Sequence, residues 1–353
     1  MVRASLSGVL VLGLLAASAP WALGVDIVTR KSGRPASGEV SAMTNAEVTV
    51  KVVTPKGEVV KVPVNDILNI TWTGESARLP LGRGAENGGK FKQALETYTA
   101  VLAEVKADAP NLKAEVEYLI ARTIAKQAAA DPTERDAAIK KLDEFVTAHA
   151  ANWHYFEAQK LLGDLYLAKA DYPKAQAAFE KLVQAPWKGT QYEAKIASGR
   201  ILLLMNKLPE AAAAFESVIS QIPPGSDETA QRLDAMLAKA KVLIRLTKPS
   251  DALKLLVEVI QASPPDDGHL QAEAALRQGE CLRALDKDKE ALFAFLRVDV
   301  LFSREKASHA EALFHLAQLW DKLGQPARAE EARTKLQADF PNSDWTRQLK
   351  KSG

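Results

Sequence analysis

The stretch NKLPEAAAAFESVISQIPP, residues 206–224, decides how the rest of this sequence is interpreted. A glycine, Gly199, stands twelve residues before Ala211, while Phe215 follows four residues after it and Pro223 eight residues later still. The same order of small residue, alanine, large apolar residue and proline recurs along the chain at intervals of 36 to 44 residues. Seven copies are centred on Ala94, Ala138, Ala175, Ala211, Ala252, Ala291 and Ala329. Ser303 replaces the proline of the sixth copy and Arg333 the large apolar residue of the seventh, and the first two copies are weaker.

Each copy has the pattern of a helical hairpin. A glycine midway along one helix and an alanine near the start of the next let two antiparallel helices approach closely. The large apolar residue then fills the groove beside them, and proline ends the second helix. Because one hairpin cannot cover its own apolar face, such units must stack on one another. Residues 75–342 are therefore predicted to form stacked helix pairs.

The segment LLGDLYLAKADYPKAQAAFEKLVQAP, residues 161–186, resembles the tetratricopeptide repeat, whose pattern is Leu-Gly-x-x-Tyr, then Ala-x-x-x-Phe, then Pro. The resemblance extends over residues 75–342, although these repeats run longer than the usual 34 residues. It implies a mainly α fold, a right-handed helical solenoid of about seven helix pairs. Residues 343–353 are expected to add a capping helix with Ser343 as its N-cap.

The first 24 residues have the build of a secretory signal peptide. Arg3 precedes a short apolar run, Pro20 breaks it, and Ala22-Leu23-Gly24 offers small residues at the two positions that a signal peptidase reads. We expect cleavage after Gly24 and an exported, periplasmic or secreted protein without an integral membrane segment. An uncleaved membrane anchor is the alternative.

Residues 25–74 are predicted to form a small antiparallel sheet or barrel of four to five strands, with turns at Gly33, Gly38, Gly57 and Gly74. Alternating segments at 47–53 and 58–64, and a further segment at 67–72, are its clearest strands. The region loosely resembles SH3-like or Sm-like barrels. Over residues 25–75, six basic residues are balanced by six acidic ones and Trp72 is the one aromatic residue, so no nucleic-acid partner is expected.

Little in the sequence points to catalysis, a cofactor or a metal. Cys281, the single cysteine, is expected to be a small buried apolar residue, because it has no companion ligand or base. Glu311 and His315 stand one helical turn apart, which predicts a pair on a helix surface. The glycine-rich segment at 82–90 lacks the spacing of a phosphate-binding loop. The sequence therefore predicts a protein that is not an enzyme.

The resemblance implies a partner-binding groove instead. In tetratricopeptide repeats, the first helix of each pair lines a concave face that takes a peptide or a partner's helix. The residues projected there are Arg122, Lys160, Asp164, Arg200, Lys241, Glu280, Arg283, Phe314 and Gln318. We expect an exported scaffold or adaptor that binds a protein or peptide in cell-envelope assembly or maintenance. The rival hypothesis is a peptidoglycan- or carbohydrate-binding or enzyme-accessory protein acting through the N-terminal β region; the oligomeric state stays open.

Overall fold

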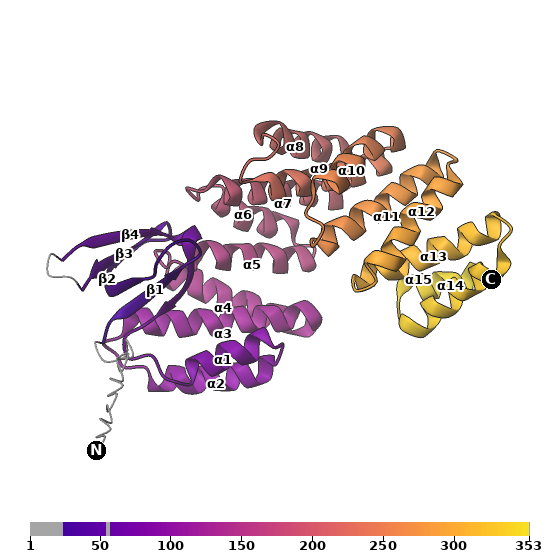
Figure 1. Cartoon of the computed structure of the whole chain (residues 1–353). Coiled ribbons are helices and arrows are strands. Elements are labelled where there is room, and N and C mark those ends of the chain that lie inside the picture. Colours follow the sequence, from indigo (N-terminus) through magenta and orange to yellow (C-terminus); the bar gives the residue numbers. More distant parts are fainter. Residues whose placement is uncertain (1–23, 54–56, 353) are drawn as a thin grey trace, which may run out of the picture. The chain divides into compact units, whose positions relative to one another are not determined.

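The computed structural model describes residues 24–53 and 57–352 (Figure 1). The predicted signal peptide, apart from Gly24, lies outside the described residues, as does most of the expected turn at 54–57. The chain divides into two compact units, which are treated separately below. The first unit runs to Ala130 and adds Glu144–Tyr155, whereas the second comprises Asp131–Asp143 and the chain from Phe156 onward.

The first unit begins with a five-stranded antiparallel sheet in the order β4-β3-β2-β1-β5. Its strands are β1 (Asp26–Arg30), β2 (Ala36–Met43), β3 (Glu47–Val52), β4 (Val59–Pro63) and β5 (Ile67–Thr71). The three strands expected from their alternating side chains are confirmed. Among the described residues β4 and β5 do not pair with each other, so of the two expected forms the protein adopts an open sheet and not a closed barrel.

One expected turn is wrong. Gly38 lies inside β2, opposite Lys51 and Val52 of β3, and not at a bend. A Cβ atom at this position would lie 1.9 Å from the carbonyl oxygen of Lys51, so only glycine lets the two strands approach this closely. Gly38 is required because two strands pack closely, but in the sequence such a glycine cannot be distinguished from one that a turn requires.

Three helices complete the core of the first unit. They are α1 (Leu79–Asn87), α2 (Phe91–Glu104) and α3 (Pro110–Ala130). Val28 and Ile70 from the sheet, and Trp72 just after β5, belong to the same buried cluster as Tyr98 and Leu119 from the helices. The alternation of the strands and the helical spacing of α2 thus point apolar side chains into one shared core.

The remaining helices continue the pairing. Helix α4 (Arg135–Ala148) contributes residues to both units. The second unit continues with α5 (Tyr155–Ala168), α6 (Tyr172–Leu182), α7 (Lys188–Leu204), α8 (Leu208–Gln221), α9 (Thr229–Arg245), α10 (Pro249–Ala262), α11 (Gly268–Ala284), α12 (Asp288–Leu301), α13 (Lys306–Lys322), α14 (Pro326–Asp339) and α15 (Asp344–Ser352). In the described part of the chain this makes seven successive helix pairs along the sequence, α1/α2 to α13/α14, followed by α15. Within the second unit the pairs stack as a helical solenoid, as expected.

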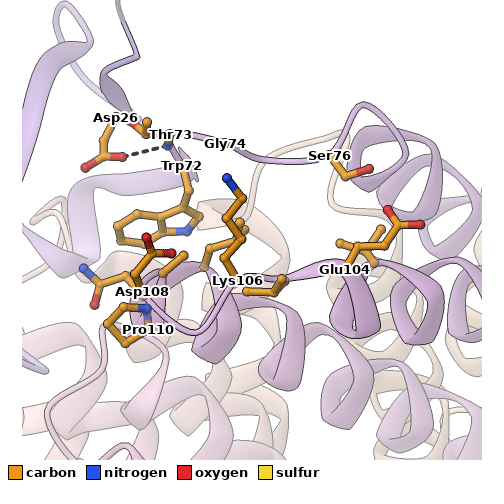
Figure 2. Close-up of a pocket in the computed structure, with 14 residues that line it drawn as sticks. Asp26, Trp72, Thr73, Gly74, Ser76, Glu104, Lys106, Asp108 and Pro110 are labelled. Carbon is orange, nitrogen blue, oxygen red and sulfur yellow. Dashed lines mark hydrogen bonds between the residues drawn. The ribbon is translucent and has the colours of Figure 1, made fainter.

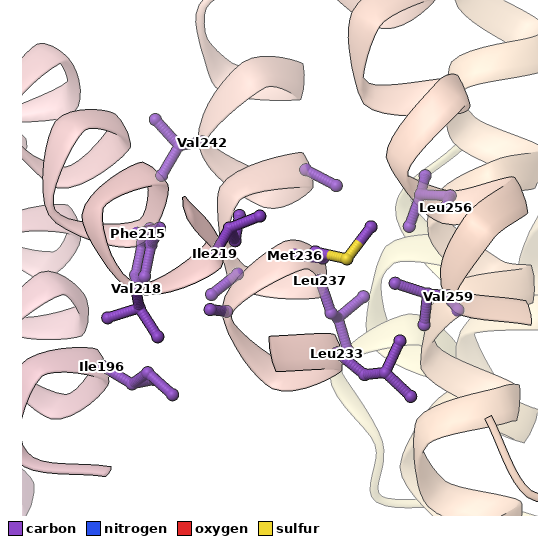
Figure 3. Packing of buried hydrophobic residues seen from close by; sticks show 14 of the residues in the cluster. Ile196, Phe215, Val218, Ile219, Leu233, Met236, Leu237, Val242, Leu256 and Val259 are labelled. Carbon is purple, nitrogen blue, oxygen red and sulfur yellow. The ribbon is translucent and has the colours of Figure 1, made fainter. Parts of the chain in front are cut away.

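The recurring motif residues make the contact that the spacing predicts. All seven recurring alanines are fully buried. A Cβ atom on Gly199 would lie 2.6 Å from the ring of Phe215, and Gly163 and Gly279 meet Phe179 and Phe295 at 2.6 and 2.5 Å. Glycine is therefore required where the second helix lays its aromatic ring across the first. Figure 3 shows Phe215 among the apolar side chains of α8, α9 and α10, including Met236 and Leu256.

The turn between the two helices of a pair follows a rule that the sequence did not reveal. In six pairs, the residue five positions before the recurring alanine has a positive φ: Gly89, Ala170, Asn206, Thr247, Asp286 and Gly324. At Asn206 the N–H donates to the carbonyl of Leu203, and the next N–H, of Lys207, donates to Leu202. This is the Schellman pattern that ends a helix with one left-handed residue. Four of the six are not glycine, which hides the rule from inspection of the sequence.

The expected capping helix is present as α15. The Ser343 hydroxyl accepts a hydrogen bond from the Thr346 N–H at 3.1 Å, as an N-cap residue should. Trp345 and Leu349 then pack against the apolar cluster of the last repeats, and the Trp345 ring lies 5.2 Å from that of Phe314. The helix therefore covers apolar surface that the final pair leaves uncovered.

The buried alanine provides a direct test of the repeat register. We predict that Ala211→Leu lowers the free energy of unfolding by about 1–3 kcal/mol, because added methylene groups overpack a closed helix–helix contact. Ala213 is exposed on the same helix, so Ala213→Leu is the matched control and should change stability by less than about 0.5 kcal/mol. Urea unfolding followed by the helical circular dichroism signal measures both; equal effects would show that the register is wrong.

The strained turn provides a second test. Thr247 is β-branched and has a φ of 56°, a conformation that such residues disfavour. We predict that Thr247→Gly raises the free energy of unfolding by about 0.5–1 kcal/mol, since relief of strain exceeds the entropy that glycine adds to the unfolded chain. Thr334 is exposed within α14, so Thr334→Gly should lower it by a similar amount. Stabilisation by neither or by both would contradict the assignment of strain to residue 247.

Candidate functional site: the A-helix face

The first helices of successive pairs in the second unit contact one another directly. Helix α7 contacts α9, α9 contacts α11, and α11 contacts α13. These helices, together with α5, form a surface that we call the A-helix face. Eight of the nine residues expected to bind a partner belong to these helices, from Lys160 on α5 to Gln318 on α13.

The cations of the A-helix face are engaged by the next repeat. Lys160 Nζ lies 2.7 Å from a Glu193 carboxylate oxygen and Lys241 Nζ lies 2.8 Å from Glu273. Arg200 pairs with Asp234, and Arg277 with Glu311 at 2.8 Å, in the same way. Each pair joins a basic residue on one first helix to an acid on the following first helix. We call these four pairs the ion-pair ladder, which ties neighbouring repeats together.

The ladder changes in character along the solenoid. The side chains of Lys160 and Arg200 are each 50% exposed, whereas that of Arg277 is 17% exposed. Exposed ion pairs contribute little to stability and exchange readily with water or a ligand. The α5–α7–α9 end of the face is therefore the part where a partner could take over these charges at low cost.

A hollow of about 280 Å³ opens at that end of the face. Its apolar lining comes from the buried residues Phe179, Leu182 and Ala197 and from the exposed Ala230. Its polar lining consists of Lys160, Asp164, Glu193, Arg200, Gln231 and Asp234. Three residues that the sequence projected onto one face, Lys160, Asp164 and Arg200, are thus brought together around one depression.

Asp164 differs from the other charged groups of this hollow. Lys160 and Arg200 each have an acidic partner, whereas Asp164 has no hydrogen bond or ion pair within the described residues. Asp164 is exposed at the rim of the hollow, and the protein packed beside its carboxylate raises its pKa, against the opposing effect of Lys160 and Arg200. The amide oxygen of Gln231 is buried in the same lining and also has no hydrogen-bond partner among the described residues.

The other end of the face is a closed charge network centred on Arg277. Its guanidinium lies 2.6 Å from Glu280, 2.8 Å from Glu311 and 3.1 Å from Glu273. Burial alone would lower the pKa of Arg277, but the three carboxylates raise it above its usual value. Burial likewise raises the pKa of Glu280. The guanidinium of Arg277 thus pairs with all three carboxylates, as is expected of a network that stabilises the fold.

Glu280, Glu311 and His315 offer ligand atoms within 4.8 Å of one another, but they do not form a convincing metal site. Arg283 donates to His315 Nδ1 at 2.7 Å, so the proton of the neutral ring sits on Nε2, the atom that faces Glu311. A metal on Nε2 would require the proton to move to Nδ1, where it would meet the guanidinium donor. The expected surface pair of Glu311 and His315 is also wrong, since both side chains are only 12% exposed.

Three further predicted groove residues have structural contacts. Arg122, in the first unit, donates two hydrogen bonds of 2.8 Å to the buried carboxylate of Glu86. Phe314 is 7% exposed and packs on Trp345, so its ring is covered by the capping helix. Gln318 accepts a hydrogen bond from Arg283 at 3.0 Å. A role for these residues in partner binding stays a prediction.

Trp72, the aromatic residue on which the carbohydrate hypothesis depends, is buried. Its indole N–H donates to Glu115 at 3.4 Å, as does that of Trp153 at 3.3 Å. Burial would raise the pKa of Glu115, but His154, Arg83 and Trp72 together lower it. A hollow of about 650 Å³ lies beside Trp72, with Lys106 and Asp108 at its edge (Figure 2). With Trp72 only 4% exposed, its ring offers no open platform for a sugar.

Cys281 is fully buried, as expected. Burial raises the pKa of its thiol to about 12, so the thiolate needed of a nucleophile is not formed near neutral pH. Among the helices of the described residues, none combines the length and apolar character needed to cross a bilayer.

Residues 160–227 and 237–299 match one tetratricopeptide-repeat family model, and residues 311–343 match a second. This chain contains tetratricopeptide repeats. The matched ranges include seven of the ten residues that line the hollow and seven of the eight residues of the ion-pair ladder. No curated protein matches the sequence.

Solved tetratricopeptide structures share the fold. A tetratricopeptide repeat protein from Parabacteroides merdae ATCC 43184 superposes with a TM-score of 0.54 at 15% identity, covering 77% of this chain and 95% of that one. The apo form of RapI superposes with a TM-score of 0.52, also at 15% identity, covering 76% of each chain. At this identity the likeness concerns the fold alone.

The sequence contained one overlooked signal for this site. Glu193, Asp234, Glu273 and Glu311 follow their basic partners by 33, 34, 32 and 34 residues. A basic residue followed by an acid about one repeat later could have revealed the ladder before the structure was known. Ala230 and Gln231, in contrast, lie in the first turn of α9 and join the hollow only through the packing of that helix, which the sequence did not show.

Proposed function

We propose that this protein is a non-enzymatic scaffold that binds a protein or peptide partner on its A-helix face, in the cell envelope after export. The observation that carries the proposal is the hollow between α5, α7 and α9, where an apolar floor meets charged side chains. Such a combination suits a peptide, whose side chains bury apolar area while its polar groups pair at the rim. The repeat fold supports the same function, since tetratricopeptide repeats bind protein or peptide partners.

The location of the hollow supports this choice over the rival carbohydrate hypothesis. The hollow lies at the exposed end of the ion-pair ladder, where charges can change partner. The ring that would stack against a sugar is instead enclosed in the core of the first unit. Export and a role in envelope assembly or maintenance rest on the signal-like segment at residues 1–24.

A site-specific photo-cross-link in the producing cells tests partner binding. Ala230 is exposed and lines the hollow, whereas Ala213 is exposed on α8, a second helix of its pair. We predict that a photoreactive amino acid at position 230 captures a discrete protein and that the same substitution at position 213 does not. Capture at both positions or at neither would contradict a partner on the A-helix face.

Charge changes at the ladder refine the same test. Reversal at Arg200 and Lys241 should abolish capture, but it also places like charges beside Asp234 and Glu273. The exchange Arg200→Asp with Asp234→Arg keeps an ion pair and should keep the melting temperature while still reducing capture. The control is Lys181→Glu with Lys254→Glu, two exposed lysines on second helices. Undiminished capture by the exchange variant would remove the ladder from the binding surface.

Export has its own measurement. We predict that the protein recovered from the periplasmic fraction or the medium begins at Val25, because signal peptidase reads Ala22 and Gly24. N-terminal sequencing gives the answer directly, with Gly24→Tyr as the variant that should block cleavage. Recovery of the chain with Met1 in the cytoplasmic fraction would contradict export.

A further inference from the structure

We infer that the hollow of the A-helix face selects a basic side chain, lysine or arginine, from the bound partner, with Asp164 as the acceptor of its charge. This inference rests on the proposed partner binding and specifies its chemistry. It comes from the pairing of charges around the hollow, which leaves one acid unmatched.

The charges of the lining do not balance. Lys160 pairs with Glu193, and Arg200 pairs with Asp234, so two basic groups face two acids. Asp164 is the third acid, and among the described residues it has no partner. The hollow therefore carries an excess of one negative charge, which complements a cation and disfavours an acidic partner.

The uncharged polar group in the lining has the same preference. The Gln231 amide oxygen is buried there without a hydrogen-bond donor among the described residues. A buried acceptor without a donor is unfavourable, so a ligand gains affinity by bringing N–H groups. Ammonium and guanidinium groups offer several N–H donors each and no acceptor.

The apolar part of the lining fits the remainder of a basic side chain. Phe179, Leu182 and Ala197 form an apolar floor beneath the charged rim. Lysine and arginine carry a long aliphatic stem below the charged head and bury that stem against apolar surface. A short polar side chain would leave this apolar surface exposed to water. A wholly apolar side chain would bring no hydrogen-bond donor for Asp164 or Gln231.

The environment of Asp164 adds a pH signature. Its carboxylate faces Lys160 on its own helix, Glu193 and Arg200 on α7, and Gln231 and Asp234 on the first two turns of α9. The protein around Asp164 raises its pKa, and a bound cation should lower it again. A cation binds the ionised form, so affinity should be full above the pKa of Asp164 in the free protein and should fall as the pH drops through it.

The test uses the whole chain and a random dodecapeptide library displayed on phage. We expect selection on the wild-type protein to enrich Lys or Arg at one position of the peptides. Selection on Asp164→Asn should lose this enrichment. Selection on Asp251→Asn, which removes an exposed acid from α10, should keep it.

A double-mutant cycle then measures the contact with a selected peptide. Asp164→Asn and replacement of the peptide's basic residue by glutamine should each weaken binding about tenfold, and the two together should cost little more than one alone. The pH dependence of affinity should disappear in Asp164→Asn. The circular dichroism spectrum and melting temperature of the variant verify that it is folded.

The outcomes separate this inference from the proposal beneath it. Peptides that bind the face without a basic preference, or whose affinity is unaffected by Asp164→Asn, would overturn the inference and leave partner binding intact. Enrichment of acidic residues would overturn the inference as well. Failure of the library to yield any binder, together with no cross-link at position 230, would overturn both.

Discussion

The contact on which the rest of this structure depends is an aromatic ring lying against a glycine in the neighbouring helix. Gly199 and Phe215, with their counterparts in other pairs, let two helices approach to a distance that any side chain on the glycine would prevent. This approach determines the shape of one hairpin, and hairpins of the same shape stack regularly. The first helices then fall into one face, and their charges meet at intervals of about one repeat.

The A-helix face shows how a repeat fold can combine stability with binding. At the Arg277 end, buried acids and a guanidinium satisfy one another and join α11 to α13. At the Lys160 end, the equivalent pairs are exposed and border a hollow with an apolar floor. The ion pairs of the ladder therefore stabilise the fold where water is excluded. Where water is present, their side chains can change to another charged partner, because the strength of an ion pair depends on its exposure.

The outcomes of the sequence predictions follow from the range of the interactions involved. The glycine-to-alanine spacing reports contact between adjacent helices, so helix pairs, their buried alanines and the Ser343 cap could be predicted well. Gly38 was misread because a glycine beside a neighbouring strand has the same sequence as one in a turn. Glu311 and His315 were placed on a surface because helical spacing reveals a shared side of a helix, and says nothing of what covers it.

The sequence by itself determined the repeat, its register and the first helices as the place to look for charged residues, since each depends on residues less than one repeat apart. Only the tertiary structure decided which of those charges remain without a partner. Lys160, Asp164 and Arg200 look equivalent in sequence, yet the first and last are paired across repeats and Asp164 is not. Whether a charged side chain finds a partner depends on residues some thirty positions away on the next first helix. The pairing is therefore decided only when the helices stack.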